Sequence, residues 1–328
     1  MRATIRDVAK LAGVSTATVS HVFNKTRYVS DEVMEKVNNA AKELGYVSNS
    51  IAKSLRSSKS NCIGLLVPNI SNYFSVDIIE PIEWILREQG YRLIIGYSHE
   101  DIECEKEQVE IFNSQQIDGM LMFPSPGDHS YLKNMNNRYP IVFLDRKAKG
   151  YDADCVMGNN EDATFEAISL LIENGHRSIG IINGIPGIST TEERMQGYVR
   201  ALQAHNIPID PALIKSGNSR FESGYEKTAE LLDDGRMTAL FVANNLMTIG
   251  AMQYLIKKKV KIPNEVALLG VGDSIWAEVT NPPLSVLRHP TIKMGEKAAE
   301  ILIKRIKEGG NDYKDHRLLI ELVRRKTF

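Results

Sequence analysis

The chain has 328 residues, of which 43% are hydrophobic and 25% are charged, with a formal net charge of −1. This length allows a small domain and one or two larger ones, and the composition excludes disordered and collagen-like proteins. No apolar run approaches the ~20 residues that span a bilayer, and the N-terminus has no apolar signal segment, so a cytoplasmic protein is expected. Residues 1–60 carry 10 Lys and Arg against 5 Asp and Glu, which predicts a basic head on an acidic body.

Two short helices are the first predicted elements, within residues 4–23. Thr4 and Asp7 have the spacing of an N-terminal capping pair, and apolar residues then recur at helical spacing. Gly13 tolerates the left-handed conformation that ends a helix, and Ser15 can cap the next helix. A break this short between two helices predicts a helix-turn-helix.

The second of these helices has a small, polar outer face. Val19, Val22 and Phe23 are predicted to pack against the first helix. The residues left outside are Thr16, Ala17, Ser20, His21 and Asn24. Short side chains that carry donors, acceptors or a methyl group suit the major groove of DNA. The alternative is an amphipathic helical hairpin that binds nothing.

Residues 4–56 resemble the DNA-binding headpiece of the LacI/GalR family of bacterial transcription regulators. The run VSTATVSHVFNKTR, which begins at Val14, is similar to that of the purine repressor branch. The resemblance implies that Thr16, Ala17 and His21 read bases, and that the operator preference is closer to the purine-repressor type than to the lac type. The full predicted DNA-binding set is Thr4, Ser15, Thr16, Ala17, Ser20, His21, Asn24, Arg27, Leu55 and Arg56.

A third helix is predicted from Ser30 to a stop at Gly45, followed by the short basic pattern SIAKSLRS at residues 50–57. The resemblance implies that this pattern is a hinge helix that orders when two copies pair on DNA, with Leu55 wedged into a base step of the minor groove. An ordinary linker residue is the alternative for Leu55. The predicted domains are a helix-turn-helix domain (1–49), a hinge and linker (50–60), and an effector-binding and dimerisation core (61–328).

The body alternates apolar strands with amphipathic helices. Strands are predicted at 62–68, 91–97, 118–124 and 141–145, and then at 178–184, 239–245 and 266–272. Such continuous apolar strands are buried on both faces, which predicts two lobes with doubly wound parallel sheets, an α/β core of the periplasmic-binding-protein type. The tail recrosses both lobes, so the first lobe comprises about 61–160 and 290–316, and the second about 161–289 and 317–328.

Ligands of open α/β sheets bind at the carboxyl ends of the strands, so the residues after each strand are the candidates. Aromatic, carboxylate, amide and guanidinium groups suit a sugar or a nucleobase. The predicted effector-binding residues are Asn69, Tyr73, Phe74, Ser125, Asp145, Arg146, Thr190, Arg194, Ser219, Phe221, Asn244 and Asp273. Each has an alternative, such as a surface ion pair for Asp145 with Arg146. The resemblance places Arg194, Asp145 and Asn244 at effector positions.

One departure from the family pattern concerns this ligand. Family members that bind sugars or purines usually have an acidic residue after the fifth strand of the second lobe, where this chain has Gly272. Asp273 comes one residue late. The purine-like head therefore does not identify the effector, and a sugar, sugar phosphate or sugar acid is favoured over a nucleobase.

Three functions fit a two-lobed body. The first is a transcription regulator, most often a repressor in this family, which binds a pseudo-palindromic operator as a homodimer and responds to an effector between the lobes. The alternatives are a solute-binding protein or an enzyme of carbohydrate metabolism. The sequence has none of the nucleotide-binding, nucleophile-elbow or zinc-protease motifs, and Cys62, Cys104 and Cys155 form no CxxC pair. No enzyme activity, cofactor, metal or membrane partner is expected, and without a heptad-bearing extension we expect a dimer rather than a tetramer.

Overall fold

The computed structural model describes residues 3–24, 27–46, 60–70, 72–135 and 139–328. The chain divides into two compact units, Met1–Ser60 and Asn61–Phe328, which we call the head and the body. The predicted hinge helix, with Leu55 and Arg56, lies outside the described residues.

The head contains the helices α1 (Ile5–Ala12), α2 (Thr16–Asn24) and α3 (Asp31–Glu43). The backbone N–H of Thr4 donates to the carboxylate of Asp7 at 2.8 Å, and the Thr4 hydroxyl accepts from the N–H of Asp7. Gly13 has a φ of 66° at the end of α1, and the N–H of Thr18 donates to Ser15 Oγ at 3.0 Å. The predicted capping pattern and helix-turn-helix are confirmed.

A small apolar core holds the three helices together. Its fully buried members are Val8, Val19 and Val37, one from each helix, and Val22 packs beside them. So few buried side chains leave the head little stability to lose.

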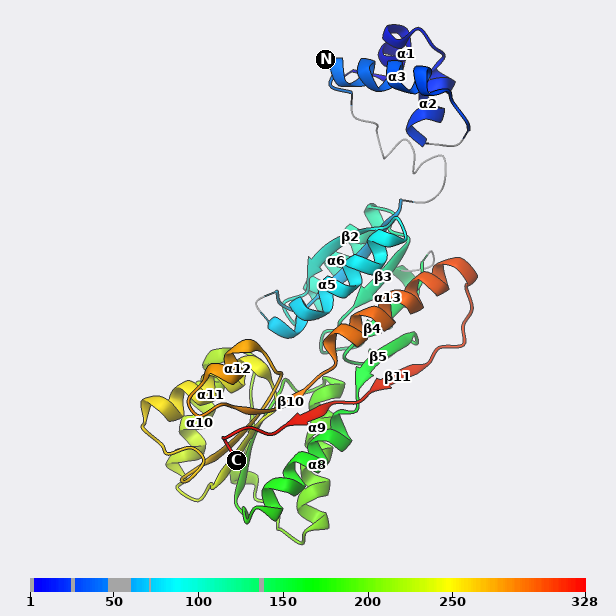
Figure 1. Cartoon of the computed structure of the whole chain (residues 1–328). Helices are drawn as coiled ribbons and strands as arrows, with labels where there is room; N and C mark the ends of the chain where they lie inside the picture. The colour runs from blue at the N-terminus through cyan, green and yellow to red at the C-terminus, as the bar shows by residue number, and fades with distance from the viewer. Residues whose placement is uncertain (1–2, 25–26, 47–59, 71, 136–138) are drawn as a thin grey trace. The chain divides into compact units, whose positions relative to one another are not determined.

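The body consists of two lobes, each built on a six-stranded sheet (Figure 1). Every pairing in the first sheet is parallel. In spatial order its strands are β11 (Asp315–Leu318), β5 (Asp154–Gly158), β4 (Ile141–Leu144), β3 (Gly119–Met122), β1 (Cys62–Val67) and β2 (Arg92–Tyr97). Strands β1, β3 and β4 are buried nearly throughout, as their unbroken apolar runs predict.

The second sheet has the same organisation, with one antiparallel strand at its edge. Its strands in spatial order are β12 (Glu321–Val323), β10 (Ser285–Arg288), β9 (Ala267–Val271), β8 (Ala239–Val242), β6 (Ile179–Asn183) and β7 (Ile214–Ser216). Only β12 runs antiparallel to its neighbour among these described strands. The predicted fold class of a helical head on a two-lobed α/β body is confirmed.

Helices cover both sheets. Those of the first lobe are α5 (Tyr73–Glu88), α6 (Ile102–Ser114), α7 (Leu132–Met135) and α13 (Thr291–Glu308). Those of the second lobe are α8 (Asn160–Glu173), α9 (Ser189–Ala204), α10 (Phe221–Asp233), α11 (Asn245–Lys257), α12 (Ile275–Val279) and the 3₁₀ turn η1 (Pro211–Leu213). The sequence did not predict β5, β7, α8 or α10. Strand β5 begins with a carboxylate, Asp154, which is buried because Arg305 Nε donates to it at 2.7 Å.

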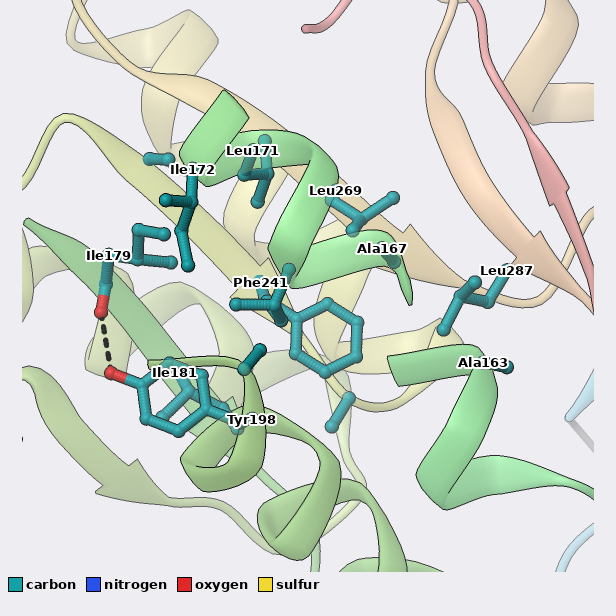
Figure 2. Packing of buried hydrophobic residues seen from close by; sticks show 14 of the residues in the cluster. Ala163, Ala167, Leu171, Ile172, Ile179, Ile181, Tyr198, Phe241, Leu269 and Leu287 are labelled. Carbon is teal, nitrogen blue, oxygen red and sulfur yellow. Dashed lines mark hydrogen bonds between the residues drawn. The ribbon is translucent and has the colours of Figure 1, made fainter. Parts of the chain in front are cut away.

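Figure 2 shows how the second-lobe core is closed around Phe241 and Tyr198. The Tyr198 hydroxyl donates to the carbonyl oxygen of Ile179 at 2.8 Å, so the ring is buried without leaving its polar group unpaired.

Three segments of the chain pass between the lobes, at residues 158–160, 288–291 and 318–321. The third joins β11 of the first sheet to β12 of the second (Figure 1). Because Arg317 and Leu318 pair with β5, the first lobe extends two residues past the boundary of 316 that we expected.

Candidate functional site

The predicted base-reading residues share the outer face of α2. Thr16 and Ala17 are exposed and Ser20 and His21 are half-buried, because Val19 turns into the head core. Three further residues of the predicted set, Thr4, Ser15 and Arg27, are exposed. The side chain of Asn24 lies outside the described residues, as do Leu55 and Arg56.

A cavity lies between the two lobes of the body, at the carboxyl ends of strands from both sheets. We call it the effector cavity. Seven of the twelve predicted effector residues are in its lining: Phe74, Asp145, Arg146, Thr190, Arg194, Ser219 and Asn244. The volume open to water-sized molecules is about 50 Å³, enough for a few waters.

Four of the other five predicted residues lie away from this lining. Asn69, in the connection after β1, and Tyr73, the first residue of α5, are exposed, Tyr73 by 52%. Phe221 begins α10, where its backbone lies against Gly250 of α11. Ser125 lines a separate cavity, and its N–H donates to Glu105 at 2.6 Å.

Asp273, the fifth, is engaged elsewhere. Its Oδ2 atom accepts from Arg288 Nε at 2.8 Å and from Arg325 Nη2 at 2.9 Å. Gly272 stands before it with a φ of 88°, and a Cβ there would lie 2.8 Å from the Cβ of Asn245. Asp273 therefore links the end of β9 to β10 and to the C-terminal segment, and it does not line the effector cavity.

Several lining residues lie outside the set of twelve predicted effector residues, among them Asn72, Asn245 and His289. Asn245 Nδ2 donates to Asn72 Oδ1, which joins the second lobe to the first. Asn245 and His289 follow β8 and β10 closely, which are positions that the strand-end rule indicates. The strand-end rule does not indicate Asn72, because a turn separates this residue from the end of β1.

Arg194 is a buried cation with neutral acceptors. Its Nε donates to Asn160 Oδ1 at 3.0 Å and its Nη1 to the carbonyl oxygen of Ala243 at 2.9 Å, while Nη2 lies 3.4 Å from His289 Nε2. Burial lowers the pKa of Arg194, and the nearby charge of Asp145 opposes that effect. The guanidinium is held rigidly in the cavity wall.

Asp145 and Arg146 face the cavity from the end of β4. Arg146 donates to Glu100 through Nη1 at 2.6 Å and Nη2 at 3.0 Å, so its charge is balanced by a carboxylate behind it. Asp145 has a φ of 66°. Its burial raises the pKa of its carboxyl, although the charges of Arg146 and Arg194 oppose the rise. Its Oδ1 has no hydrogen-bond partner among the described residues and is available to a ligand.

An aromatic wall completes the cavity. The rings of Phe74 and His289 are 5.2 Å apart and meet edge to face, and Phe74 also packs against Phe123. Burial, with a smaller contribution from Arg194, lowers the pKa of His289 to about 3, so the imidazole is neutral at physiological pH. An apolar ring beside directed donors and acceptors is a binding arrangement suited to a polar ring compound.

Two negative observations apply to the described part of the chain. No group of three His, Cys, Asp or Glu side chains is arranged there to hold a metal ion. None of its helices is long and apolar enough to cross a membrane.

A helix-turn-helix head on a two-lobed body with a polar cavity defines a ligand-responsive DNA-binding protein. Residues 4–49 match the family model described as bacterial regulatory proteins, lacI family, and residues 168–328 match the periplasmic binding protein-like domain. The chain is 34% identical over 329 residues to the HTH-type transcriptional repressor PurR of Vibrio atlanticus, an alignment that covers 99% of this chain and 98% of the relative. The chain belongs to the LacI family and is a DNA-binding regulator of transcription.

Solved structures agree with this assignment over the whole length. The lac repressor dimer bound to operator and the anti-inducer ONPF superposes with a TM-score of 0.88 at 25% identity, covering 100% of this chain and 99% of that one. A complex of the transcriptional regulator CelR with cellobiose has a TM-score of 0.75 at 29% identity and full coverage of both chains. These relatives are transcriptional regulators and not enzymes.

Proposed function

We propose that this protein is a repressor that binds a pseudo-palindromic operator as a homodimer and is controlled by a sugar or sugar derivative bound in the effector cavity. The observation that carries the effector class is the trio of Asp145, Arg194 and Phe74 around one cavity. A carboxylate and a guanidinium can bond adjacent hydroxyl groups of a sugar, and the phenyl ring offers it an apolar face.

The balance of charge favours a neutral ring in the effector cavity. Arg146 is neutralised by Glu100, and Arg194 lies in the field of Asp145. A purine is less favoured, although relatives named PurR are similar to the chain, because Asp273 is held by Arg288 and Arg325. The CelR structure contains cellobiose and the lac repressor structure contains ONPF.

Ligand binding is proposed to change the spacing of the lobes. The effector cavity is lined by both lobes, so a ligand bound there contacts both of them and depends on how they are arranged. Besides the Asn72–Asn245 hydrogen bond, Arg317 Nη2 contacts Glu193 across the lobes at 2.7 Å. A ligand that replaces such contacts binds the two arrangements with different affinities, which is the requirement for control.

DNA reading is assigned to the outer face of α2, with Thr16, Ala17, Ser20 and His21 against base edges. The wedge at Leu55 remains a prediction from sequence. A regulator that acts on chromosomal DNA works in the cytoplasm, where we infer that this protein is located.

The proposal is tested in two steps. A thermal-shift screen against sugars, sugar phosphates, sugar acids and purines identifies the effector, because a ligand that binds only the folded state raises the melting temperature. A mobility-shift assay then selects operators from random duplexes with and without that ligand. Indifference to every duplex at low ionic strength, or a response only to purines, would overturn the proposal.

A further inference from the structure

A second cavity adjoins the effector cavity and shares Arg146 and Ile188 with it. Its volume is about 210 Å³. The first lobe contributes the loops that follow β3 and β4, and the second lobe contributes the loop after β6 and the first turn of α9. We call it the lateral cavity.

Cationic side chains predominate in the lining of the lateral cavity. The lining contains three cationic side chains, Arg146, Lys147 and Lys149, and one carboxylate, Glu192, which is exposed. Arg146 is balanced by Glu100 and Lys147 by Asp315. Lys149 has no ion pair within 4 Å among the described residues, and the carboxylate of Asp128 interacts with it only at longer range, so its ammonium can still bind an anion.

Two deeply buried side chains in this lining have unused hydrogen-bonding atoms. Ser125 is 3% exposed and His129 is 1% exposed. Neither Ser125 Oγ nor His129 Nδ1 has a partner within the described structure. Buried polar atoms left without a partner are unfavourable, and a ligand in the cavity could pair with them.

A buried carboxylate, Glu105, lies behind both of these residues. Glu105 accepts the N–H of Ser125 at 2.6 Å and lies 3.0 Å from His129 Nε2. The Tyr131 hydroxyl donates to the same carboxylate at 2.7 Å. Glu105 thus accepts hydrogen bonds from behind the lining, and the hydroxyl of Ser125 is left without a partner.

The start of α9 supplies a third feature. The helix has 16 residues, and Ile188 at its N-cap provides no side-chain hydrogen bond. Ser189 Oγ accepts from the N–H of Lys147 at 2.9 Å, which leaves its own proton to donate. Uncapped N–H groups and the positive end of the helix dipole favour an anion here.

We propose that the lateral cavity binds a phosphoryl group, either inorganic phosphate or the phosphate of an ester. Its tetrahedral oxygens match donors that converge from several directions: the Lys149 ammonium, the hydroxyls of Ser125 and Ser189, and the first turn of α9. Because the donors come from both lobes, the bound anion stabilises the lobe arrangement described here. The site is therefore distinct from the part of the effector cavity that we assign to the sugar ring.

The experiment is calorimetric titration of the full-length protein with inorganic phosphate, at constant ionic strength and without DNA. We expect saturable binding of one phosphate per chain. Lys149→Glu should weaken it about tenfold or more and Ser125→Ala severalfold. Lys304→Glu is the matched control, because Lys304 is an exposed lysine of α13 that lines neither cavity, and it should bind as wild type does.

Absence of saturable binding up to tens of millimolar phosphate overturns the proposal, as does equal loss in the two lysine variants. Glucose and glucose 6-phosphate separate the sources: an ester that binds more tightly than phosphate and displaces it identifies a substituent of a larger ligand, whereas independent binding of phosphate and glucose identifies a separate ion. Both results support the site. A protein that still selects an operator and answers to a sugar, but ignores phosphate, loses only this inference.

Discussion

Arg194 has a guanidinium in the effector cavity whose three hydrogen-bonding neighbours are all neutral: Asn160, the carbonyl of Ala243, and His289. Its positive charge is balanced through space, by Asp145 and to a smaller extent by Glu193. A ligand hydroxyl or carboxylate can therefore compete for it without first breaking an ion pair. Asn160 and His289 belong to segments that pass between the lobes. Arg194 therefore links ligand binding to the lobe arrangement.

Replacing Arg194 by lysine should remove the effector response and retain DNA binding. The compact ammonium group of lysine cannot reach all three neighbours that the planar guanidinium of Arg194 contacts. We expect ligand affinity to fall about tenfold or more, seen as loss of the ligand-induced rise in melting temperature. The mobility shift without ligand is the control, and a response that survives in Arg194→Lys would remove this residue from the site.

His289 makes stability depend on pH. Its folded pKa of about 3 lies below the ordinary 6.5, so the folded protein binds this proton less readily than the unfolded chain. The stabilisation is fully present above pH 6.5 and is lost as pH falls toward 3, by about 1.4 kcal/mol per pH unit. Relative to His289→Gln, the wild type should lose about 2 kcal/mol of unfolding free energy between pH 7 and pH 5, measured by urea denaturation. A constant difference would contradict the assignment.

At the scale of elements, glycines set how closely the second-lobe helices approach. A Cβ on Gly250 of α11 would lie 2.1 Å from the carbonyl oxygen of Phe221 in α10, and one on Gly197 of α9 would lie 2.3 Å from that of Glu161 in α8. These neighbours are backbone atoms, which cannot turn aside as a side chain can.

Gly250→Ala should therefore destabilise the body by about 1–3 kcal/mol, although alanine favours a helix more than glycine does. Urea denaturation measures the change. Gln253→Ala, at an exposed position of the same helix, should stay within about 0.5 kcal/mol of wild type. An unchanged or more stable Gly250→Ala protein would show that α10 and α11 can separate without cost.

Elements that are determined by neighbouring residues could be predicted from the sequence. Elements that depend on contacts between distant residues could not. The caps at Thr4 and Ser15 and the apolar run of β1 are written in adjacent residues. Strand β5 depends on Arg305, which lies far along the chain from its partner Asp154. For the same reason the strand-end rule found Asp145 but missed Asn72, which reaches the cavity through its contact with Asn245.

The whole molecule is two units, so damage to one should spare the other. Val19 is fully buried in the small head core, and Val19→Ala should cost about 2 kcal/mol there. We expect operator binding in a mobility shift to be lost or strongly weakened, while the ligand-induced rise in the melting temperature of the body is retained. Loss of both would show that the units do not fold independently.

Pairing of two bodies should depend on exposed apolar side chains. On α12, Ile275 is 82% exposed and Val279 is 77% exposed, and a double change to aspartate should shift the protein from dimer to monomer. Analytical ultracentrifugation at micromolar protein measures the state. Leu319→Asp is the control, because Leu319 is 81% exposed but lies in the connection between β11 and β12, outside α12. A double variant that stays dimeric would assign the interface elsewhere.

The position of β11 and β12 near the carboxyl terminus has a consequence for synthesis. The first sheet lacks its edge strand β11 until Leu318 has been synthesised, and the second lacks β12 until Val323, whereas the helices of the head are synthesised first and need no later residue to form their core. A prematurely terminated product would thus have an intact head, but its two lobes would lack their edge strands. Such a fragment would compete for operators without answering to any metabolite, so a late nonsense mutation should have a different phenotype from a deletion of the gene.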